Sequence, residues 1–357
     1  MHALATESGT RTRRQALAAW SQRTGMLSLA GKLRGMLRQD LRILAYHRVL
    51  DSVDPDRFEF DLELISASAD AFRRQMNMLK RDFEPMRFDQ VIEHVDAGRR
   101  LPARAVLVTF DDGYDDNYRV AYPILRELGV PAMFFVSTGH IESGMPYAYD
   151  WLVHMICKTA ATELVVPEAA VAWNLPTGLQ ARRQCAASFL VALKRCDALV
   201  QEAIIESLAH RWEMPVAVHP ECRPMSWAQL GEMRDGGMEI GSHGVNHRML
   251  AKLPPQLMAR EINESKSTLE SMLGEPARVI SYPVGGYEAF DDDVAMVARN
   301  AGFRMACSYI TGTNRMAAAA FFSLRRLHVE RSVDVAWFQG MLELPEIFSY
   351  RTNMLIG

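Results

Sequence analysis

The stretch from residue 105 to residue 114, Ala-Val-Leu-Val-Thr-Phe-Asp-Asp-Gly-Tyr, decides the fold class. A short apolar run that ends in turn residues is typical of a strand buried in a parallel sheet. Two adjacent carboxylates, Asp111 and Asp112, follow the run, and Gly113 lets the chain turn sharply after them. Active sites in parallel α/β folds lie at the carboxyl ends of strands, so this pair is a candidate for catalysis. The alternative interpretation is two exposed aspartates in a turn.

Short apolar segments alternate with helical patterns along most of the chain. The expected strands are residues 42–47, 105–110, 132–137, 238–242, 278–282, 303–308 and 324–329. The expected helices are residues 69–80, 88–97, 118–128, 227–234, 256–273 and 291–300. This alternation implies a parallel sheet with helices outside, either doubly wound or closed, and about seven strands favour a barrel.

The expected organisation has a basic amphipathic extension at residues 1–40, a barrel at 41–345 and a C-terminal tail at 346–357. The alternation stops at about residues 144–225, where helical patterns and prolines predominate. This range is predicted to be a mostly helical insertion between two barrel strands, either a lid or the wall of a subdomain.

Composition excludes several classes of protein. The chain has 357 residues, of which 49% are hydrophobic and 23% charged, so it can bury a sizeable core. A net charge of −3 argues against a nucleic-acid binder that depends on overall positive charge. No segment approaches the ~18 consecutive apolar residues that predict a transmembrane helix. The five cysteines include no Cys-x-x-Cys pair, which favours a reducing compartment over a disulfide scaffold or a cysteine-ligated zinc site.

The first 40 residues carry seven basic side chains interleaved with apolar ones: Arg11, Arg13, Arg14, Arg23, Lys32, Arg34 and Arg38. The pattern predicts one basic amphipathic helix, or two that separate near Gly25. Such a helix either docks peripherally on an anionic membrane face or packs on the body of the protein. The segment lacks the continuous apolar core of a signal peptide, so the expected location is the cytoplasm, with peripheral contact at the inner membrane face.

Two histidines, His243 and His247, follow a short apolar strand. Their i, i+4 spacing would bring both imidazoles to one side of a helical turn, a spacing that metal sites use, although such pairs also arise by coincidence. Two histidines and one carboxylate form a three-ligand set that leaves a coordination position open for water, as in catalytic zinc sites. Asp111 and Asp112 can divide the work, because adjacent residues of an extended chain point in different directions: one binds metal and the other is the general base.

A third segment, residues 278–287, is again a strand that runs into a loop. Pro283 restricts the backbone, and Gly285 and Gly286 allow a close approach. A loop of this kind can direct a backbone N–H at a developing oxyanion, or it can be an ordinary barrel loop.

Together these segments resemble a known family. Residues 109–113, the pair His243 and His247, and residues 282–285 are similar to the first three motifs of the polysaccharide deacetylases, the NodB-homology domain of carbohydrate esterase family four. Residues 44–48, Leu-Ala-Tyr-His-Arg, resemble the first strand of one branch of that family. The resemblance implies a deformed (β/α)7 barrel and one divalent metal ion, most often zinc, with cobalt, nickel or manganese as alternatives.

The resemblance also implies roles for individual residues. Asp112, His243 and His247 would hold the metal, and Asp111 would be the general base. The backbone N–H of Val284 would help to hold the oxyanion.

The sequence departs from the family pattern at three places. Gly244 stands where Ser or Thr usually follows the first histidine. Ser281 stands where an arginine often orients the base, and the nearby Arg278 is the candidate substitute. The late Leu-x-His motif, which supplies the general acid, is not cleanly present; His328 is the best candidate for that role, and it could equally be a structural histidine.

Several residues near the strand ends are candidate substrate contacts. Tyr282 lies in the third motif, His47 ends the first strand without an assigned role, and Asp116 is a further candidate. Aromatic side chains could form a platform for a pyranose ring, with Tyr114 and Trp227 favoured. The full aromatic set is Tyr114, Tyr147, Trp151, Trp227 and Tyr287.

The expected activity is hydrolytic N-deacetylation of an N-acetylated sugar in a polysaccharide, an oligosaccharide or a lipid-linked glycan. Removal of O-acetyl groups is an alternative, because the same groups can attack an ester. A barrel that binds glycans without turning them over is a second alternative, based on the missing arginine and the unassigned acid. The presence of both aspartates and both histidines argues for catalysis.

Overall fold

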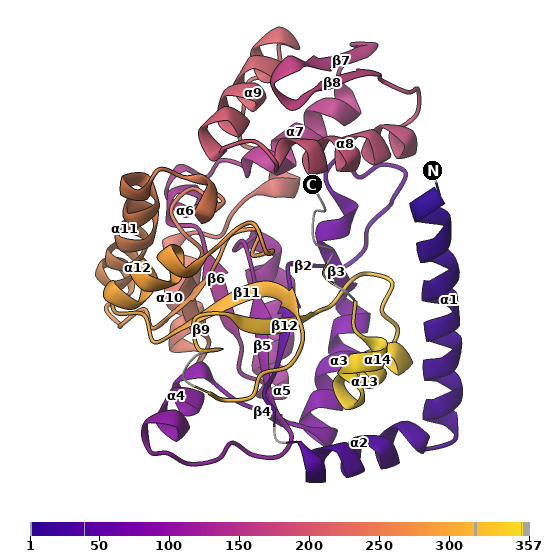
Figure 1. The fold of residues 1–357 in the computed structure, drawn as a ribbon, viewed down its shortest axis with the longest axis vertical. Coiled ribbons are helices and arrows are strands. Elements are labelled where there is room, and N and C mark those ends of the chain that lie inside the picture. The colour runs from indigo at the N-terminus through magenta and orange to yellow at the C-terminus, as the bar shows by residue number, and fades with distance from the viewer. Residues whose placement is uncertain (1, 39, 318–319, 351, 353–357) are drawn as a thin grey trace.

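The computed structural model describes residues 2–38, 40–317, 320–350 and 352 (Figure 1). Seven parallel strands form a closed barrel, in which β1 pairs with β12 on one side and with β5 on the other. Around the barrel the strands are β1 (Arg42–Tyr46), β12 (Leu324–His328), β11 (Met305–Thr311), β10 (Val279–Ser281), β9 (Glu239–Ser242), β6 (Met133–Val136) and β5 (Ala105–Phe110). A short strand, β4 (Glu84–Pro85), pairs with the start of β5. The predicted barrel is confirmed.

Helices cover the outside of the barrel. They are α3 (Ala69–Asp82), α4 (Phe88–Asp96), α5 (Tyr122–Leu128), α6 (Thr138–Ser143), α10 (Trp227–Asp235), α11 (Pro255–Leu273), α12 (Asp292–Asn300), α13 (Val335–Glu343) and α14 (Pro345–Phe348). Side-chain caps fix where some begin: the hydroxyl of Ser68 accepts a hydrogen bond from the backbone N–H of Ala71. The helix expected at 118–128 is instead a π-helical turn, η2 (Asn117–Ala121), followed by α5.

The range predicted as an insertion contains helices and a hairpin. The helices are α7 (Ala148–Lys158), α8 (Leu179–Leu193) and α9 (Ala198–Arg211), and the antiparallel hairpin, which the sequence did not predict, is β7 (Glu163–Val166) and β8 (Val171–Asn174). These elements lie together at the top of Figure 1. Their apolar core also includes Phe60, Ile65 and Tyr114 from segments of the barrel. This shared core favours a fixed wall over a mobile lid.

The segment between β1 and α3 adds a second small sheet beside the insertion. It consists of β2 (Arg48–Leu50) paired in parallel with β3 (Ile65–Ser68), preceded by the turn η1 (Leu62–Leu64).

The N-terminal residues form two helices, α1 (His2–Arg23) and α2 (Met26–Leu37), which separate at Gly25. Both pack against α13, and the side chain of Gln22 donates to that of Gln339 over 2.9 Å. In Figure 1, α1 runs along one side of the barrel and α2 crosses the end opposite the insertion. Within the described ranges, no helix has the length and apolarity needed to cross a bilayer. The predicted tail begins inside α14, and residues 351 and 353–357 lie outside the described residues.

Candidate active site

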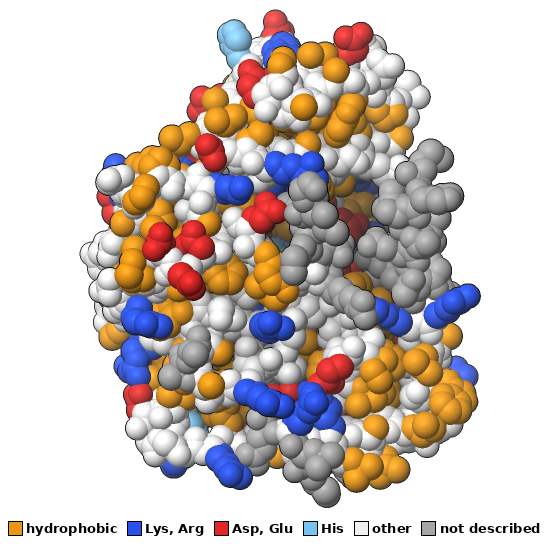
Figure 2. Space-filling model, in the orientation of Figure 1, with side chains coloured by type: hydrophobic (Ala, Val, Ile, Leu, Met, Phe, Trp, Pro, Cys, Tyr) orange, Lys and Arg blue, Asp and Glu red, His pale blue; other side chains and the backbone are white. Residues whose placement is uncertain are grey.

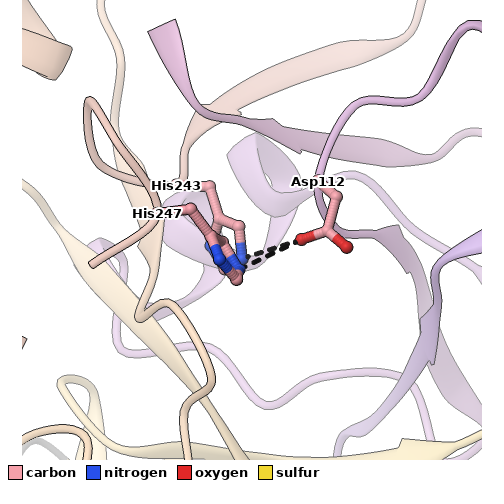
Figure 3. A group of neighbouring side chains, drawn as sticks. All are labelled: Asp112, His243 and His247. Atoms are coloured by element: carbon pink, nitrogen blue, oxygen red, sulfur yellow. Dashed lines mark ion pairs between the residues drawn. The ribbon is translucent and has the colours of Figure 1, made fainter. Parts of the chain in front are cut away.

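Three side chains converge at the carboxyl end of the barrel (Figure 3). Asp112 follows β5, and His243 and His247 lie on the loop that follows β9. The Nε2 atoms of His243 and His247 lie 3.4 and 3.3 Å from Oδ1 of Asp112. Asp112 reaches this place with a left-handed backbone, φ 73°, and Gly113 continues it at 74°, so the chain turns back over the strand end. The three residues predicted as metal ligands are therefore close neighbours.

The arrangement fits a metal ion better than a hydrogen-bonded cluster. Oδ1 of Asp112 is buried and has no hydrogen-bond partner among the described residues, although both imidazoles are near. Ligand atoms about 2.0–2.1 Å from a tetrahedral ion stand about 3.3–3.4 Å apart, which matches the two separations. His243 Nδ1 lies 2.7 Å from the carbonyl oxygen of Ser281, to which it donates, so Nε2 remains as the nitrogen that a metal binds. Two imidazoles and one carboxylate are a donor set that zinc prefers.

The two histidines lie on a loop and not on the helical turn that their spacing suggested, so that part of the prediction was wrong. Glu261 of α11, which is buried, organises this loop: its Oε2 accepts hydrogen bonds from the backbone N–H groups of Val245 and Asn246 over 2.7 and 2.9 Å. Gly244 has a φ of 77°, and a Cβ there would lie 3.2 Å from Oε2 of Glu261. The glycine that departs from the family pattern thus fits a backbone that other residues rarely adopt.

Glu261→Ala is expected to weaken zinc binding by about 10–100-fold, because the loop that carries both histidines loses the carboxylate that fixes two of its N–H groups. Calorimetric titration of zinc into the metal-free chain measures this effect. The matched control is Glu264→Ala, on the same helix, where an exposed carboxylate pairs with Arg260. Equal zinc affinity in Glu261→Ala and the wild type would contradict the role given to Glu261.

Asp111, the predicted base, is held by an arginine from the opposite end of the sequence. Its two carboxylate oxygens accept hydrogen bonds from Arg326 of β12 over 2.8 and 2.7 Å, and both side chains are buried. Arg326 also donates to the carbonyl oxygen of Ser308 over 2.7 Å and to the hydroxyl of Ser281 over 3.0 Å. Burial acts to raise the pKa of Asp111, but Arg326, together with His243 and His47, outweighs burial and holds the pKa below its ordinary value. The carboxylate is therefore ionised at neutral pH.

Arg326 occupies the orienting position for which Arg278 was the candidate. Arg278 is partly exposed, pairs with Asp89 over 2.9 Å and does not contact Asp111, so that candidate was wrong. Ser281, at the family's arginine position, instead accepts a hydrogen bond from Arg326. The sequence could have indicated that Arg326 points toward the site, because side chains alternate along a strand and Arg326 lies on the same face of β12 as His328, the candidate acid.

Val284 combines backbone strain with an unused donor. Its φ is 62°, a left-handed conformation that is costly for a β-branched residue. It lines a cavity that Asp111, Asp112, His243 and His247 also line, and its backbone N–H forms no hydrogen bond within the described part of the chain. Strained backbone of this kind is concentrated at functional sites. The position is compatible with the predicted oxyanion contact.

Two further histidines flank Tyr309. The ring of His328 is buried and stacks on that of Tyr309 with centroids 3.7 Å apart, and its Nε2 has no partner among the described residues. Burial lowers the pKa of His328 to about 3, so the imidazole is neutral at physiological pH. His47 lines the cavity, with its ring edge-on to Tyr309. The general-acid role of His328 stays a prediction.

Tyr114 lines the cavity, but its hydroxyl is already occupied. It donates to Asp150 over 2.5 Å, and Arg48 lies over its ring. Asp116 is buried in an ion pair with Arg48 at 2.9 Å, so it supports the cavity wall and does not line the cavity.

Tyr282 and Trp227 are not among the residues that line the cavity. The side chain of Tyr282 is fully buried, so its predicted substrate contact was wrong, whereas that of Trp227 stays a prediction. Tyr282 follows Ser281 and points to the opposite face of the strand, where its hydroxyl donates to the carbonyl oxygen of Phe322 over 3.0 Å. Trp227 begins α10 and packs against the barrel core.

The three candidate metal ligands, Asp112, His243 and His247, line a cavity of about 320 Å³. One side is lined by strand-end residues, and the other by Tyr147, Tyr149, Leu190 and Lys194 of the insertion. Ligand cavities are commonly about 300–1,000 Å³, so this one suits a single sugar with its acetamide better than a long stretch of polymer. Leu190 and Lys194 carried no signal in the sequence.

Comparisons with known proteins agree with this geometry. YxkH of Bacillus subtilis (strain 168), provisionally named a polysaccharide deacetylase, is 22% identical over 240 residues, which cover 67% of this chain and 57% of that protein. The poly-beta-1,6-N-acetyl-D-glucosamine N-deacetylase of Escherichia coli (strain K12) is 33% identical over 153 residues, 39% of this chain and 21% of that protein. The chain thus spans less than two thirds of the length of these relatives.

The fold is shared with a solved structure, that of the Streptococcus pyogenes deacetylase PplD in complex with acetate. The TM-score is 0.56 at 19% identity, covering 87% of this chain and 99% of that chain. The family model for polysaccharide deacetylase matches residues 98–306, more than half of the chain, and that range includes both aspartates, the histidine loop and Val284. The chain belongs to the polysaccharide deacetylase family.

Proposed function

We propose that this chain is a metal-dependent hydrolase that removes the acetyl group from the acetamide of an N-acetylated sugar. The observation that carries the proposal is the set of Asp112, His243 and His247, spaced as ligands around a tetrahedral ion and adjacent to Asp111. A divalent ion held there would polarise the acetyl carbonyl and lower the pKa of a water molecule. Zinc is favoured by the donor set, and cobalt, nickel or manganese could use the same ligands.

The other residues of the cavity have complementary tasks. Asp111, which Arg326 keeps ionised and oriented, accepts the proton of the water that attacks the acetyl carbon. The N–H of Val284 donates to the carbonyl oxygen as negative charge develops on it. The C–N bond then breaks, acetate leaves, and the departing amine takes up the proton that Asp111 accepted from the water.

The E. coli relative named above acts on poly-beta-1,6-N-acetyl-D-glucosamine, and we propose an N-acetylglucosamine glycan as the substrate class here. The test is acetate release by the zinc-reconstituted chain from β-1,6-linked N-acetylglucosamine oligomers, with an O-acetylated sugar in parallel. The expected result is faster release from the acetamide than from the ester. Release from the ester alone would overturn the proposal in favour of an O-acetyl esterase, and release from neither would favour a glycan-binding barrel.

We also propose that the corner formed by α1 and α2 contacts an anionic membrane surface, as expected for a peripheral protein of the inner face. Figure 2 shows hydrophobic side chains gathered at this corner. Large apolar side chains there are 45–62% exposed: Leu17, Trp20, Met26, Leu29 and Leu33. Residues 8–39 contain seven Lys and Arg and no Asp or Glu. An apolar surface within a purely basic segment is complementary to anionic lipid.

The triple change Trp20→Ser, Leu29→Ser and Leu33→Ser is expected to weaken vesicle binding at least about tenfold, because each side chain would lose burial in the bilayer interface. Co-sedimentation with phosphatidylglycerol vesicles, compared with phosphatidylcholine vesicles, measures this. The control is Val216→Ser with Val218→Ser, which removes exposed apolar side chains from the insertion. A wild-type chain that stays in the supernatant with both vesicles would overturn the membrane proposal.

A further inference from the structure

Lys194 of the insertion lines the cavity and has no counter-ion among the residues that the structure describes. Lys194 follows the last residue of α8 and lines the cavity beside Tyr149. Its Nζ lies 5.1 Å from the centre of the Tyr149 ring, a cation–π contact. Its ammonium group forms no hydrogen bond or ion pair with the residues that the structure describes, so its three donors remain for a ligand.

Other cations around the site are already paired. Arg326 pairs with Asp111 over 2.7 Å, and Arg48 pairs with Asp116 over 2.9 Å. Neither arginine is among the residues that line the cavity, and each charge is neutralised by a buried carboxylate. Lys194 differs because it lines the cavity and has no ion-pair partner in the described part of the chain.

Asp61, the acidic group with the largest electrostatic effect on Lys194, does not serve as an ion-pair partner. Asp61 lines the cavity, but its carboxylate caps η1 by accepting a hydrogen bond from the backbone N–H of Glu63 over 2.9 Å. Burial lowers the pKa of Lys194, and Asp61 and Asp112 only partly oppose this effect from beyond ion-pair distance. A shielded ammonium without a counter-ion is costly, and an anionic ligand would remove that cost.

Lys194 is held within reach of the reacting group. The ring of Tyr149 contacts both groups: its centre lies 5.1 Å from Nζ of Lys194 and 6.2 Å from the ring centre of His247. Leu190 and Leu193, in the last turn of α8, belong to the apolar core that the insertion shares with the barrel. The ammonium group therefore lines the same cavity as the three candidate metal ligands.

We propose that Lys194 forms an anion subsite that binds a carboxylate or phosphate carried by the sugar being deacetylated or by its neighbour. The inference rests on the proposed function and narrows the substrate class from any N-acetylated glycan to an acidic one. A lysine ammonium is a common point-charge partner for phosphate and carboxylate groups.

Calorimetry on the zinc-loaded full chain tests the subsite without requiring turnover. The probes are N-acetylglucosamine, N-acetylglucosamine 6-phosphate and N-acetylmuramic acid, so that neutral, phosphate and carboxylate groups are compared. We expect at least one acidic probe to bind about tenfold or more tighter than the neutral sugar. Lys194→Met should abolish this preference and leave neutral binding unchanged, whereas Lys194→Arg should retain much of it.

The matched control is Lys158→Met, in the same insertion, where the ammonium group pairs with Glu59 over 2.7 Å outside the cavity. Equal affinity for acidic and neutral probes would overturn the subsite, as would an equal loss of both in Lys194→Met. If acetate release is absent but the acidic preference persists and depends on Lys194, the proposed reaction fails and the subsite stands. If acetate is released without such a preference, the subsite fails and the reaction stands.

Discussion

Asp111→Asn is expected to slow acetate release by about a thousandfold and to leave zinc binding intact. Loss of a general base typically costs about 10²–10⁴-fold in rate. Asp111 is not one of the three candidate metal ligands. Both of its carboxylate oxygens accept hydrogen bonds from Arg326, so the loss of its charge should leave zinc binding intact. Asp112→Asn is expected to weaken zinc binding and, with it, turnover. Acetate release and zinc titration on the same preparations separate the two roles.

Thermal unfolding of both variants is the control, because both carboxylates are buried. The account is contradicted by an Asp111→Asn chain that turns over within tenfold of the wild type. It is equally contradicted by an Asp112→Asn chain that binds zinc as the wild type does.

Arg326→Met is expected to move the acidic limb of the pH–rate profile up by about 1–3 pH units, with lower turnover at pH 7. Arg326 lowers the pKa of Asp111 against the effect of burial, so its removal lets burial raise that pKa. The free energy of unfolding also depends on pH through this ion pair. The folded-state pKa lies below the unfolded value of about 3.9, so the pair stabilises the fold above that pH. This contribution is lost as the pH falls through the lowered folded-state pKa.

Breaking a buried pair also costs about 3–5 kcal/mol of stability, so a second variant keeps the test informative. Arg326→Lys retains a charge without the two-point contact, and we expect an intermediate shift of the profile. The matched control is Arg325→Met, the adjacent residue, whose side chain is exposed on the other face of β12. An acidic limb that stays in place in both Arg326 variants would contradict this role.

The sequence predicts the barrel and the donor set because both rest on local signals. The strand that ends at Phe110 is contiguous with Asp111 and Asp112, and the two histidines lie four residues apart. Parallel strands place such ends at one end of the barrel whatever the details of the loops. The structure therefore brings Asp112, His243 and His247 together as expected, even though the helical turn predicted at the histidines is a loop.

The features that the sequence missed depend on contacts between distant segments. Arg326 is 215 residues from Asp111, and only the closure of β12 against β1 brings the two together. Glu261 holds the histidine loop through backbone N–H groups, which carry no residue-specific signal. Lys194 reaches the cavity because the core of the insertion is continuous with that of the barrel. Alternation along β12 can place Arg326 on one face of the strand, but periodicity within one segment does not identify the partner of any of these residues.

Zinc titration of the metal-free chain, with acetate release from N-acetylglucosamine oligomers recorded at each step, tests the central claim most directly. The account predicts no turnover without metal, a linear rise on addition of zinc, saturation at one ion per chain, and no recovery in His243→Ala. Full turnover by the metal-free chain, or equal recovery in His243→Ala, would contradict it.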